Sequence, residues 1–468
     1  MRDTLRAQLW PLPTLGVTLA IAAGVGMPRM DKRIRDDMPP LLRDYLFSGN
    51  ADAARSVLAA IAGSLVTVTA LTFSLTVLTL QLASSQFSPR LLRTFTADRY
   101  FQTTLALFLA TFTYALTVLR TVHTGEDGQT EFVPQASVTL AFLLTLASVL
   151  ALVVFLSHLA REIRVETMMS SVHSAADRTI HRLLPGEPEE TGEPEKGEEG
   201  ERREEADRAR QNRAAKDRRG APPEPPPNTL TLTVGASGFL TSVDEEALLK
   251  AAVAADAVLL IDRGPGSSLI IGTPMGAAWP RDGEPFAPET RARLVEAVAE
   301  AVITGSERTD LQDIAFGLRQ LTDIAAKALS PGVNDPTTAV HALSHSSALL
   351  CDLAQRDLGP HLLFDDDQQV RVVLRRPTLE DLLDLAVDQP LRYGAAEPAV
   401  LTRIAMLLRE VAWSCAPGQQ PPVIAALTRL RSTVEAQNLH PTERLRLTEL
   451  TQLVEQALAG RWTHSPMP

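Results

Sequence analysis

Two groups of histidine and aspartate residues have spacings that place side chains on one face of a helix. The first group is His341, His345 and Asp352, and the second is His173, Asp177 and His181. Such side chains bind Zn²⁺, which takes three or four ligands in a fixed geometry. Neither group contains the glutamate of a His-Glu-x-x-His motif, and no Cys-x-x-Cys pair accompanies them. Solvated polar faces explain both groups better, so we predict no metal site and no cofactor.

A face of hydroxyl groups lies within a long uncharged segment, residues 57–82. Its members are Thr69, Thr72, Thr76 and Thr79, which occupy an arc of roughly 80° on a helix. They would either line a hydrated path for ions or small solutes, or serve helix packing by bonding across membrane helices or to their own backbone. We prefer packing, because transport usually requires an ionisable group within the membrane and the uncharged segments have none at their centres.

The residues after this segment have the pattern of a short helix at the membrane surface. Ser88 can cap such a helix and Pro89 fits its first turn. Arg90 and Arg93 would then contact lipid headgroups while the leucines between them face lipid. Anchoring through phosphate contacts is a better interpretation than recognition of one particular lipid.

Motifs of known enzyme classes are missing from the sequence. It contains no P-loop, no G-x-G-x-x-G and no G-x-S-x-G. The Gly264-Pro265-Gly266 turn is weak evidence for phosphate binding, because a prolyl nitrogen donates no hydrogen bond. Cys351 and Cys415 fall in helical patterns and are expected to be small core residues. We predict that the protein is not an enzyme.

Composition indicates that apolar and charged residues are segregated along the chain. The mean hydropathy is +0.02, although 22% of the 468 residues are charged. The formal net charge of −11 argues against a nucleic-acid binder, which needs a basic surface. Two cysteines in the whole chain exclude a disulfide framework.

Four segments are long and apolar enough to cross a membrane, for which roughly 20 helical residues are needed. They are residues 9–27, 57–82, 103–119 and 136–159. The first contains proline and glycine and follows basic residues, so a cleaved signal peptide is an alternative there. We prefer an uncleaved first span. The lipid bilayer is therefore one predicted partner, and the chain is expected in the cell (inner or plasma) membrane.

The distribution of lysine and arginine predicts the orientation of the spans. Arginines follow the second and fourth spans, whereas the connection between the third and fourth spans has one arginine, Arg120. This pattern places that connection outside and the carboxy-terminal part in the cytoplasm. The 28–56 connection would then also lie outside, despite its six lysines and arginines. The sequence therefore does not decide on which side of the membrane the 28–56 connection lies.

The remainder of the chain divides into a linker and a soluble domain. A helical stalk is expected to complete a transmembrane domain at residues 1–184. Residues 185–228 are charged and proline-rich, which predicts a disordered linker. Residues 229–468 form a predicted α+β domain. Its expected strands are residues 229–234, 238–242, 257–262, 268–271 and 368–374, and its expected helices are residues 245–255, 311–329, 379–387, 398–415, 422–437 and 442–459.

Four sequence segments resemble the bacterial predicted membrane proteins of the domain-of-unknown-function family 2254. They are LASSQFSPRLLR (82–93), FVPQ (132–135), FGLRQL (316–321) and ALSPGVNDPTTA (328–339). The resemblance implies a membrane protein without an established activity, in which the long linker departs from the usual compact spacing. The motif positions of unknown role are Ser85, Gln86, Ser88, Pro89, Arg319, Asn334, Asp335 and Pro336. Helix capping is the simpler role for Asn334 or Asp335, with Pro336 at the first helical position.

Together these features predict a polytopic α-helical membrane protein with about four spans and a carboxy-terminal soluble α+β domain. One functional hypothesis is an oligomeric channel or transporter-like protein with a cytoplasmic sensing domain. Because four short spans enclose little space, a pore would require a homo-oligomer. The alternative is a membrane scaffold that transports nothing and binds a protein partner through its soluble domain.

Overall fold

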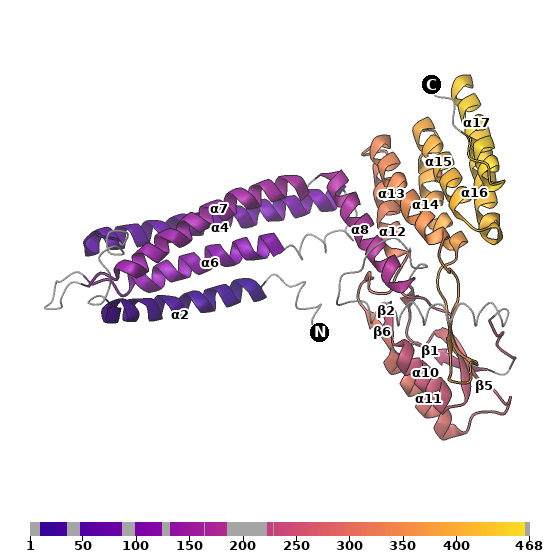
Figure 1. Cartoon of the computed structure of the whole chain (residues 1–468), viewed down its shortest axis with the longest axis horizontal. Coiled ribbons are helices and arrows are strands. Elements are labelled where there is room, and N and C mark those ends of the chain that lie inside the picture. Colours follow the sequence, from indigo (N-terminus) through magenta and orange to yellow (C-terminus); the bar gives the residue numbers. More distant parts are fainter. Residues whose placement is uncertain are drawn as a thin grey trace, which may run out of the picture. The chain divides into compact units, whose positions relative to one another are not determined.

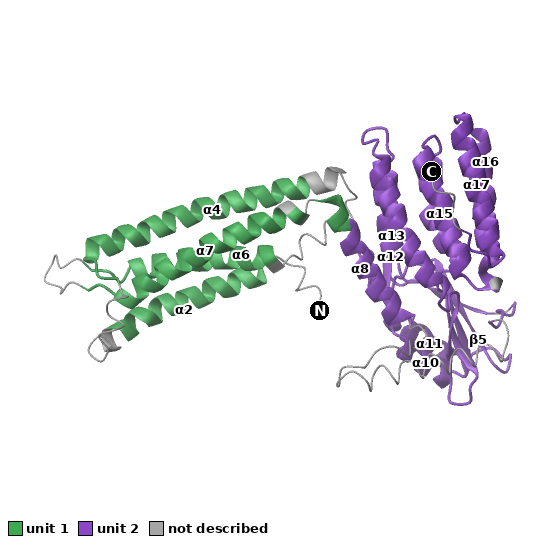
Figure 2. Cartoon of the chain, turned by 45° about the horizontal axis from the view of Figure 1, so that its top comes forward, with its two compact units in different colours: residues 1–168 green, residues 169–468 purple. Residues whose placement is uncertain are grey.

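The structure is a computed structural model that describes residues 10–34, 47–86, 99–123, 132–162, 164–184, 222–227 and 229–463. The chain divides into two compact units, Met1–Met168 and Met169–Pro468, which Figure 2 shows in different colours. The predicted surface helix with Ser88, Pro89, Arg90 and Arg93 lies outside the described residues. Most of the predicted linker lies outside them as well.

Four long apolar helices make up the first unit and lie side by side (Figure 1). They are α2 (Pro11–Ile34), α4 (Ala51–Gln86), α6 (Arg99–Leu119) and α7 (Gln135–Glu162). Each contains a segment that can cross a membrane: Pro11–Asp31, Ala51–Gln81, Tyr100–Leu119 and Gln135–Leu159. The expectation of about four spans is confirmed, and the first segment is a continuous helix despite its prolines and glycines.

Two glycines of α2 permit its close packing against α6. A side chain at Gly24 would lie 2.7 Å from Cβ of Thr117, and one at Gly16 would lie 3.1 Å from the Ala106 carbonyl oxygen. Small residues at such contacts let membrane helices approach each other. Large apolar side chains such as Leu71 and Phe142 are exposed on the outer faces, where lipid would contact them.

The amino end of α7 binds residues that flank the connection between α2 and α4. The Asp31 carboxylate accepts hydrogen bonds from the Ala136 and Ser137 amides, at 3.3 and 3.1 Å, and from the Ser137 hydroxyl at 3.0 Å. The Phe47 amide donates to Oγ1 of Thr139 at 2.9 Å. The end of α2 and the start of α7 therefore lie at the same end of the bundle. The 28–56 connection, whose side of the membrane the sequence did not decide, therefore lies on the same side as the start of α7.

Helix α8 (Val165–Leu183) follows α7 in the chain and packs within the second unit. A side chain at position 317 would collide with Ala176 of α8, so Gly317 is needed for this close approach. The Thr179 hydroxyl and the Arg182 guanidinium also donate to the Asp310 carbonyl oxygen, at 3.1 and 3.3 Å.

The second unit contains two β-sheets. The larger sheet has the strand order β1-β5-β3-β8-β7, with β3 and β8 parallel and the other pairs antiparallel. Its strands are β1 (Leu230–Thr233), β3 (Ala257–Ile261), β5 (Pro274–Pro280), β7 (His361–Phe364) and β8 (Val370–Leu374). The smaller sheet is antiparallel, in the order β4-β2-β6: β2 (Gly238–Val243), β4 (Ser268–Leu269) and β6 (Val302–Gly305). Helices α10 (Glu245–Ala254) and α11 (Pro288–Ala301) share one hydrophobic core with both sheets.

Within the described residues, six further α-helices belong to the second unit. They are α12 (Phe316–Ala328), α13 (Pro336–Ala354), α14 (Leu379–Tyr393), α15 (Pro398–Ser414), α16 (Gln420–Ala436) and α17 (Pro441–Leu458). Helix α15 packs between α13 and α17, and α14 packs between α12 and α16 (Figure 1). This arrangement gives two layers of helices.

The predicted fold class is confirmed, because the chain has four apolar helices followed by a mixed α/β region with two sheets. The expected strands at β1 to β4 and β8 are present, whereas β5, β6 and β7 were missed. The helix expected from Leu311 begins five residues later, at Phe316, and Leu311 is exposed. A short apolar strand such as HLLF, residues 361–364, offers too little periodicity to be recognised.

Candidate functional site: an arginine-lined cavity at the edge of the larger sheet

A cavity of about 40 Å³ lies where the parallel strands β3 and β8 end. The two strands end in register, with Ile261 beside Leu374. Arginines follow both strands, Arg263 after β3 and Arg375-Arg376 after β8, and all three line the cavity. The carboxyl ends of parallel strands are a common position for ligand sites in α/β proteins.

Three other segments complete the cavity. Val243 and Glu245 come from the junction of β2 and α10, and Gln312 and Asp313 come from the segment before α12. Leu183, the last residue of α8, forms a further part of the wall. The cavity therefore joins the strand ends to the helix that follows the fourth span in the chain.

The three arginines differ in how they are held. Arg376 donates to Glu245 at 3.4 Å and is largely buried, and burial lowers its pKa. Arg375 pairs with Asp262 at 3.2 Å in an exposed position. Arg263 makes no hydrogen bond or ion pair within the described part of the chain. One guanidinium is thus available to a ligand.

Glu245 is held in its ionised form. Burial alone would raise its pKa, but hydrogen bonds and charges from His361 and Arg376 outweigh burial and lower the pKa of Glu245. Nε2 of His361 lies 3.3 Å from a Glu245 carboxylate oxygen. The carboxylate is therefore already neutralised by a cation and an imidazole.

Asp313 is almost fully buried and pairs with Arg308. Nε and Nη2 of Arg308 donate to one Asp313 oxygen at 3.0 and 2.5 Å, and the Ala315 amide donates to the other at 3.1 Å. Burial raises the pKa of Asp313, while the charges of Arg308 and Arg319 oppose that shift. Three arginines line the cavity, Arg263, Arg375 and Arg376, together with two carboxylates, Glu245 and Asp313.

The Gly264-Pro265-Gly266 turn shapes one wall of the cavity. Gly266 has a φ of +86°, and a side chain there would collide with the Asp313 carboxylate. A side chain at Gly264 would lie 2.8 Å from the Arg375 carbonyl oxygen. The Gly266 amide donates to the Leu240 carbonyl at 2.7 Å. The turn therefore contributes shape, and the Gly266 amide is not free to bind a phosphate.

The threonine face of α4 bonds to its own backbone. Each hydroxyl donates to the carbonyl oxygen four residues earlier, at 2.6 Å for Thr69, 2.8 Å for Thr72 and Thr76, and 2.9 Å for Thr79. Thr72 and Thr79 are buried within the unit. These bonds favour the packing interpretation over a hydrated path.

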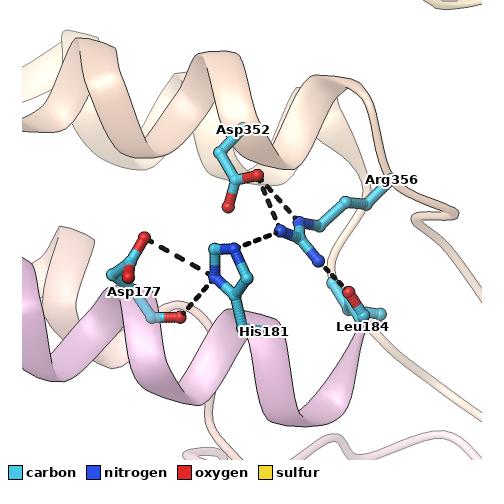
Figure 3. Close-up of polar contacts among 5 residues, drawn as sticks. All are labelled: Asp177, His181, Leu184, Asp352 and Arg356. Carbon is cyan, nitrogen blue, oxygen red and sulfur yellow. Dashed lines mark hydrogen bonds and ion pairs between the residues drawn. The ribbon is translucent and has the colours of Figure 1, made fainter. Parts of the chain in front are cut away.

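Helices α8 and α13 bring the two histidine–aspartate groups together. Asp177, His181 and Asp352 each offer a ligand atom within 4.8 Å of the others. Figure 3 shows the Arg356 guanidinium beside His181 and Asp352, with Nη2 3.0 Å from Nε2 of His181 and 2.8 Å from Asp352, whereas Asp177 lies on the other side of His181. Arg356 also donates to the Leu184 carbonyl oxygen. The ion pairs Asp177–His181 and Asp352–Arg356 each lie within one segment, and hydrogen bonds from Arg356 to His181 and Leu184 join the end of α13 to α8.

The motif residues near residue 335 form a helix cap. The Asp335 carboxylate accepts from the Thr338 amide at 3.1 Å and from its hydroxyl at 2.6 Å. Pro336 occupies the first turn of α13, and Asn334 has a φ of +50°. The predicted helix cap is confirmed, and the N-cap residue is Asp335. Ser85 and Gln86 lie in the last turn of α4.

Comparison with known proteins agrees with these motifs. Residues 6–410 match the model of the family described as predicted membrane protein, DUF2254. The chain belongs to this family. Uncharacterised proteins of Mycobacterium tuberculosis and Mycobacterium bovis are each 34% identical to it over 414 residues, which cover 88% of this chain and 73% of the relative. No solved structure matches the chain.

The DUF2254 match includes every residue that lines the cavity and every residue of the ion-pair cluster. Helices α16 and α17 lie beyond it. Arg263, Arg375 and Arg376 were not among the site residues predicted from the sequence. The available signal was that arginines follow two expected strands, but only the parallel pairing of β3 with β8 brings them together.

Proposed function

We propose that this DUF2254 protein is a membrane-anchored receptor whose second unit binds a small anion in the arginine-lined cavity. One observation carries the proposal: Arg263, which has no partner within the described residues, lines a cavity that also contains the last residue of α8, Leu183. A planar guanidinium suits the oxygen atoms of phosphate and carboxylate groups. Because both lining carboxylates, Glu245 and Asp313, are paired with an arginine, the charge of Arg263 favours an anion over a cation.

The size of the cavity limits the ligand. A water molecule needs about 10–15 Å³ when volume is measured in this way. A cavity of about 40 Å³ therefore accepts a group the size of a phosphate or carboxylate. A larger ligand would place only its anionic group inside and would leave the rest in solvent.

The chemistry of the cavity supports binding over catalysis. Among the described residues that line it, none carries a hydroxyl, thiol, amine or imidazole. Its two carboxylates, Glu245 and Asp313, are each paired with an arginine. General acid–base catalysis requires a group that can exchange a proton with the substrate. We therefore propose a non-enzymatic role.

Leu183 provides a route from the cavity to the membrane-spanning part of the chain. It ends α8, which begins three residues after the fourth apolar helix ends. An anion that displaces Leu183 would change the position of the end of α8. Hydrogen exchange of the α8 amides should therefore change when phosphate is added, and unchanged exchange at saturating phosphate would contradict this coupling.

A cytoplasmic second unit completes the proposal. Its support is the group of arginines after the fourth span, which includes Arg161 and Arg164. A single cysteine introduced by Ser170→Cys, with Cys351 and Cys415 replaced by alanine, should react with a membrane-impermeant reagent only in inverted vesicles. Reaction in intact cells would overturn the orientation.

Transport is not included in the proposal, because the hydroxyls of α4 bond to their own helix. Homo-oligomerisation, which a pore would require, stays a prediction. The mass of the detergent-solubilised protein would test it.

Binding is tested with inorganic phosphate and the full-length protein in detergent. At a phosphate concentration 100 times Kd, binding should stabilise the native state by about 2.7 kcal/mol. Arg263→Gln should abolish this stabilisation, because it removes the available guanidinium. Arg293→Gln is the matched control, since Arg293 is exposed and lies far along the chain on α11. Equal responses of both variants and the wild type, or equal stabilisation by chloride, would overturn the proposal.

A further inference from the structure

Another cavity, of about 390 Å³, lies where the ends of three helices meet. Trp413 is in the last turn of α15, Gln420 begins α16 and Leu458 ends α17. The volume is within the range of ligand-binding pockets, roughly 300–1,000 Å³. All residues that line this cavity lie beyond the family match, which ends at residue 410. Membership of the family therefore does not account for it.

Two exposed tryptophans stand beside this cavity. Trp413 lines it and is 52% exposed, and Trp462 is 43% exposed. Their ring centroids are 5.6 Å apart, with the ring planes inclined by 62°. Tryptophan is usually well buried and is enriched at the centres of binding interfaces. Two exposed indole rings next to a cavity therefore indicate a surface that binds a partner.

Arg409 holds the ring of Trp462 in position. The guanidinium carbon of Arg409 lies 3.9 Å from the centroid of the Trp462 ring, and the Arg409 side chain is largely buried. Arg409 also donates to the carbonyl oxygen of Thr463, the residue after Trp462. Because the ring is fixed before a partner arrives, less entropy is lost on binding.

The chain contains a segment of the kind that aromatic grooves bind. Residues 222–227 have the sequence PPEPPP and form neither helix nor strand, and residues 224–227 are exposed. Proline fixes φ near −65° and favours the polyproline II helix, which has three residues per turn. Pro222 and Pro225 then share one edge of this helix, and Pro223 and Pro226 share the next. Aromatic-lined grooves bind such edges because the helix is already formed.

The charges of the two surfaces are complementary. Glu224 is exposed and interrupts the run of prolines. Arg461 lies between Gly460, which lines the cavity, and Trp462. It is exposed, and its side chain has no hydrogen bond or ion pair within the described residues. An ion pair between Glu224 and Arg461 would therefore orient the segment in the cavity.

The position of the segment in the fold indicates which copy provides it. Only two residues separate Pro227 from β1. Figure 1 shows β1 and the carboxy-terminal end of the chain, next to α17, at opposite ends of the second unit. The segment thus lies at the other end of the unit from the cavity of its own chain. Copies in one membrane share one orientation, so the second unit of a neighbouring copy lies on the same side.

We propose that the cavity beside Trp413 binds residues 222–227 of a second copy of this chain. The prolines would pack against Trp413 and Trp462, while Glu224 pairs with Arg461. Because the donated segment and the accepting cavity are different surfaces, each copy can donate one segment and accept one. This interface does not involve the anion cavity and does not depend on the proposed receptor function.

The probe is a fluorescein-labelled peptide with the sequence of residues 220–229. The receptor is the full-length protein in detergent with Pro225→Ala and Pro226→Ala, which remove its own segment from competition. The fluorescence anisotropy of the peptide should rise and saturate as receptor is added. Trp413→Ala in this receptor should weaken binding at least about tenfold, because it removes an exposed aromatic anchor.

Tyr393→Ala is the matched control, because Tyr393 of α14 is 56% exposed and does not line the cavity. Trp413→Phe keeps an aromatic ring and should bind more tightly than Trp413→Ala. A peptide with Glu224→Gln should bind more weakly than the original peptide, and Arg461→Gln should remove this difference. The proposal is overturned if the peptide does not bind, or if Trp413→Ala binds it as tightly as Tyr393→Ala does.

Two differently tagged variants test whether the segment comes from a second copy. One carries Trp413→Ala and can only donate its segment, and the other carries Pro225→Ala with Pro226→Ala and can only accept one. This complementary pair should copurify in detergent, whereas a pair in which both chains carry Trp413→Ala should not. Equal copurification of the two pairs would overturn the exchange between copies.

Residues 464–468 of the same chain are the other possible occupant, because they follow Trp462 and Thr463 directly. Deleting them should leave the affinity for the peptide unchanged. If the peptide binds only after this deletion, these residues fill the cavity and the proposal is overturned.

Discussion

In the first unit a buried hydroxyl bonds to its own helix, whereas in the second unit a buried charge binds a distant segment of the chain. Thr72 and Thr111 donate to carbonyl oxygens one turn earlier, at 2.8 Å each. In the second unit, Arg371 of β8 donates to Asp365 at 2.6 Å and to Asp256 at 2.7 Å, which joins three segments.

The difference follows from the solvent around each unit. A helix in hydrocarbon must satisfy its polar groups internally, because no water replaces a lost partner. Polar contacts also join helices of the first unit, as in the 3.2 Å contact between the Thr111 and Ser148 hydroxyls, but each of these hydroxyls also donates to its own helix. A water-soluble domain can use arginine–carboxylate pairs, which tolerate burial when both partners are hydrogen-bonded.

Arg371→Met should therefore cause the largest loss of stability. Both Arg371 and Asp365 are buried, with 7% of each side chain exposed, so the substitution removes the opposite charge from a buried carboxylate that keeps the Gln369 amide as a donor. Such a change costs about 3–5 kcal/mol. Denaturant unfolding of the full-length protein in detergent, followed by hydrogen exchange in β3 and β8, measures it.

Arg281→Met is the matched control, because Arg281 contacts Asp256 at 3.7 Å from an exposed position. An exposed pair contributes less than about 1 kcal/mol. If the two variants lose equal stability, burial of the pair is not what makes Arg371 important.

Asp31→Ala should have an intermediate effect, as the one described carboxylate that joins two helices of the first unit. It removes the acceptor of three hydrogen bonds at the amino end of α7. Loss of a helix cap costs about 1–2 kcal/mol. Unfolding in mixed detergent–dodecyl sulfate micelles is a suitable measurement. Ser137→Ala should cost less, since both backbone bonds to Asp31 remain, and an equal cost would contradict a capping role.

Asp335→Ala should cost about 1 kcal/mol through loss of the α13 cap. Hydrogen bonds from Thr338 lower the pKa of Asp335. The folded pKa is thus below the unfolded value of 3.8, so the cap stabilises fully above pH 3.8 and is lost as the pH falls through the folded value. The difference in unfolding midpoint between the wild type and Asp335→Ala should shrink over that range. A constant difference would mean that the carboxylate charge contributes nothing.

The comparison of the two units also explains what the sequence could predict. The spans were predicted because hydrocarbon requires long uncharged helices, and few other structures produce such segments. The Asp335 cap was predicted because a cap and its helix are neighbours in sequence. Both features are local.

The arginine cavity was not predicted, because its residues come from segments between Leu183 and Pro377. From the sequence alone, Arg263 and Arg375 resemble ordinary exposed arginines. Only the parallel pairing of β3 with β8 places them beside each other. The histidine groups on α8 and α13 were predicted as two separate groups, because nothing in their spacing indicates that α8 packs on α13.

Thr72→Val should have the smallest effect, and it bears directly on the unused transport hypothesis. Thr72 is buried, and its hydroxyl donates to the Val68 carbonyl within the same helix. Valine has nearly the same shape, so stability should change by less than about 0.5 kcal/mol. Thr111→Val is the comparison variant, because it removes the contact with Ser148 and should cost about 0.6 kcal/mol or more. Any ion flux measured in liposomes should be the same for the wild type and for Thr72→Val combined with Thr76→Val. A flux that disappears in this double variant, with stability unchanged, would show that the threonine face lines a path for solutes.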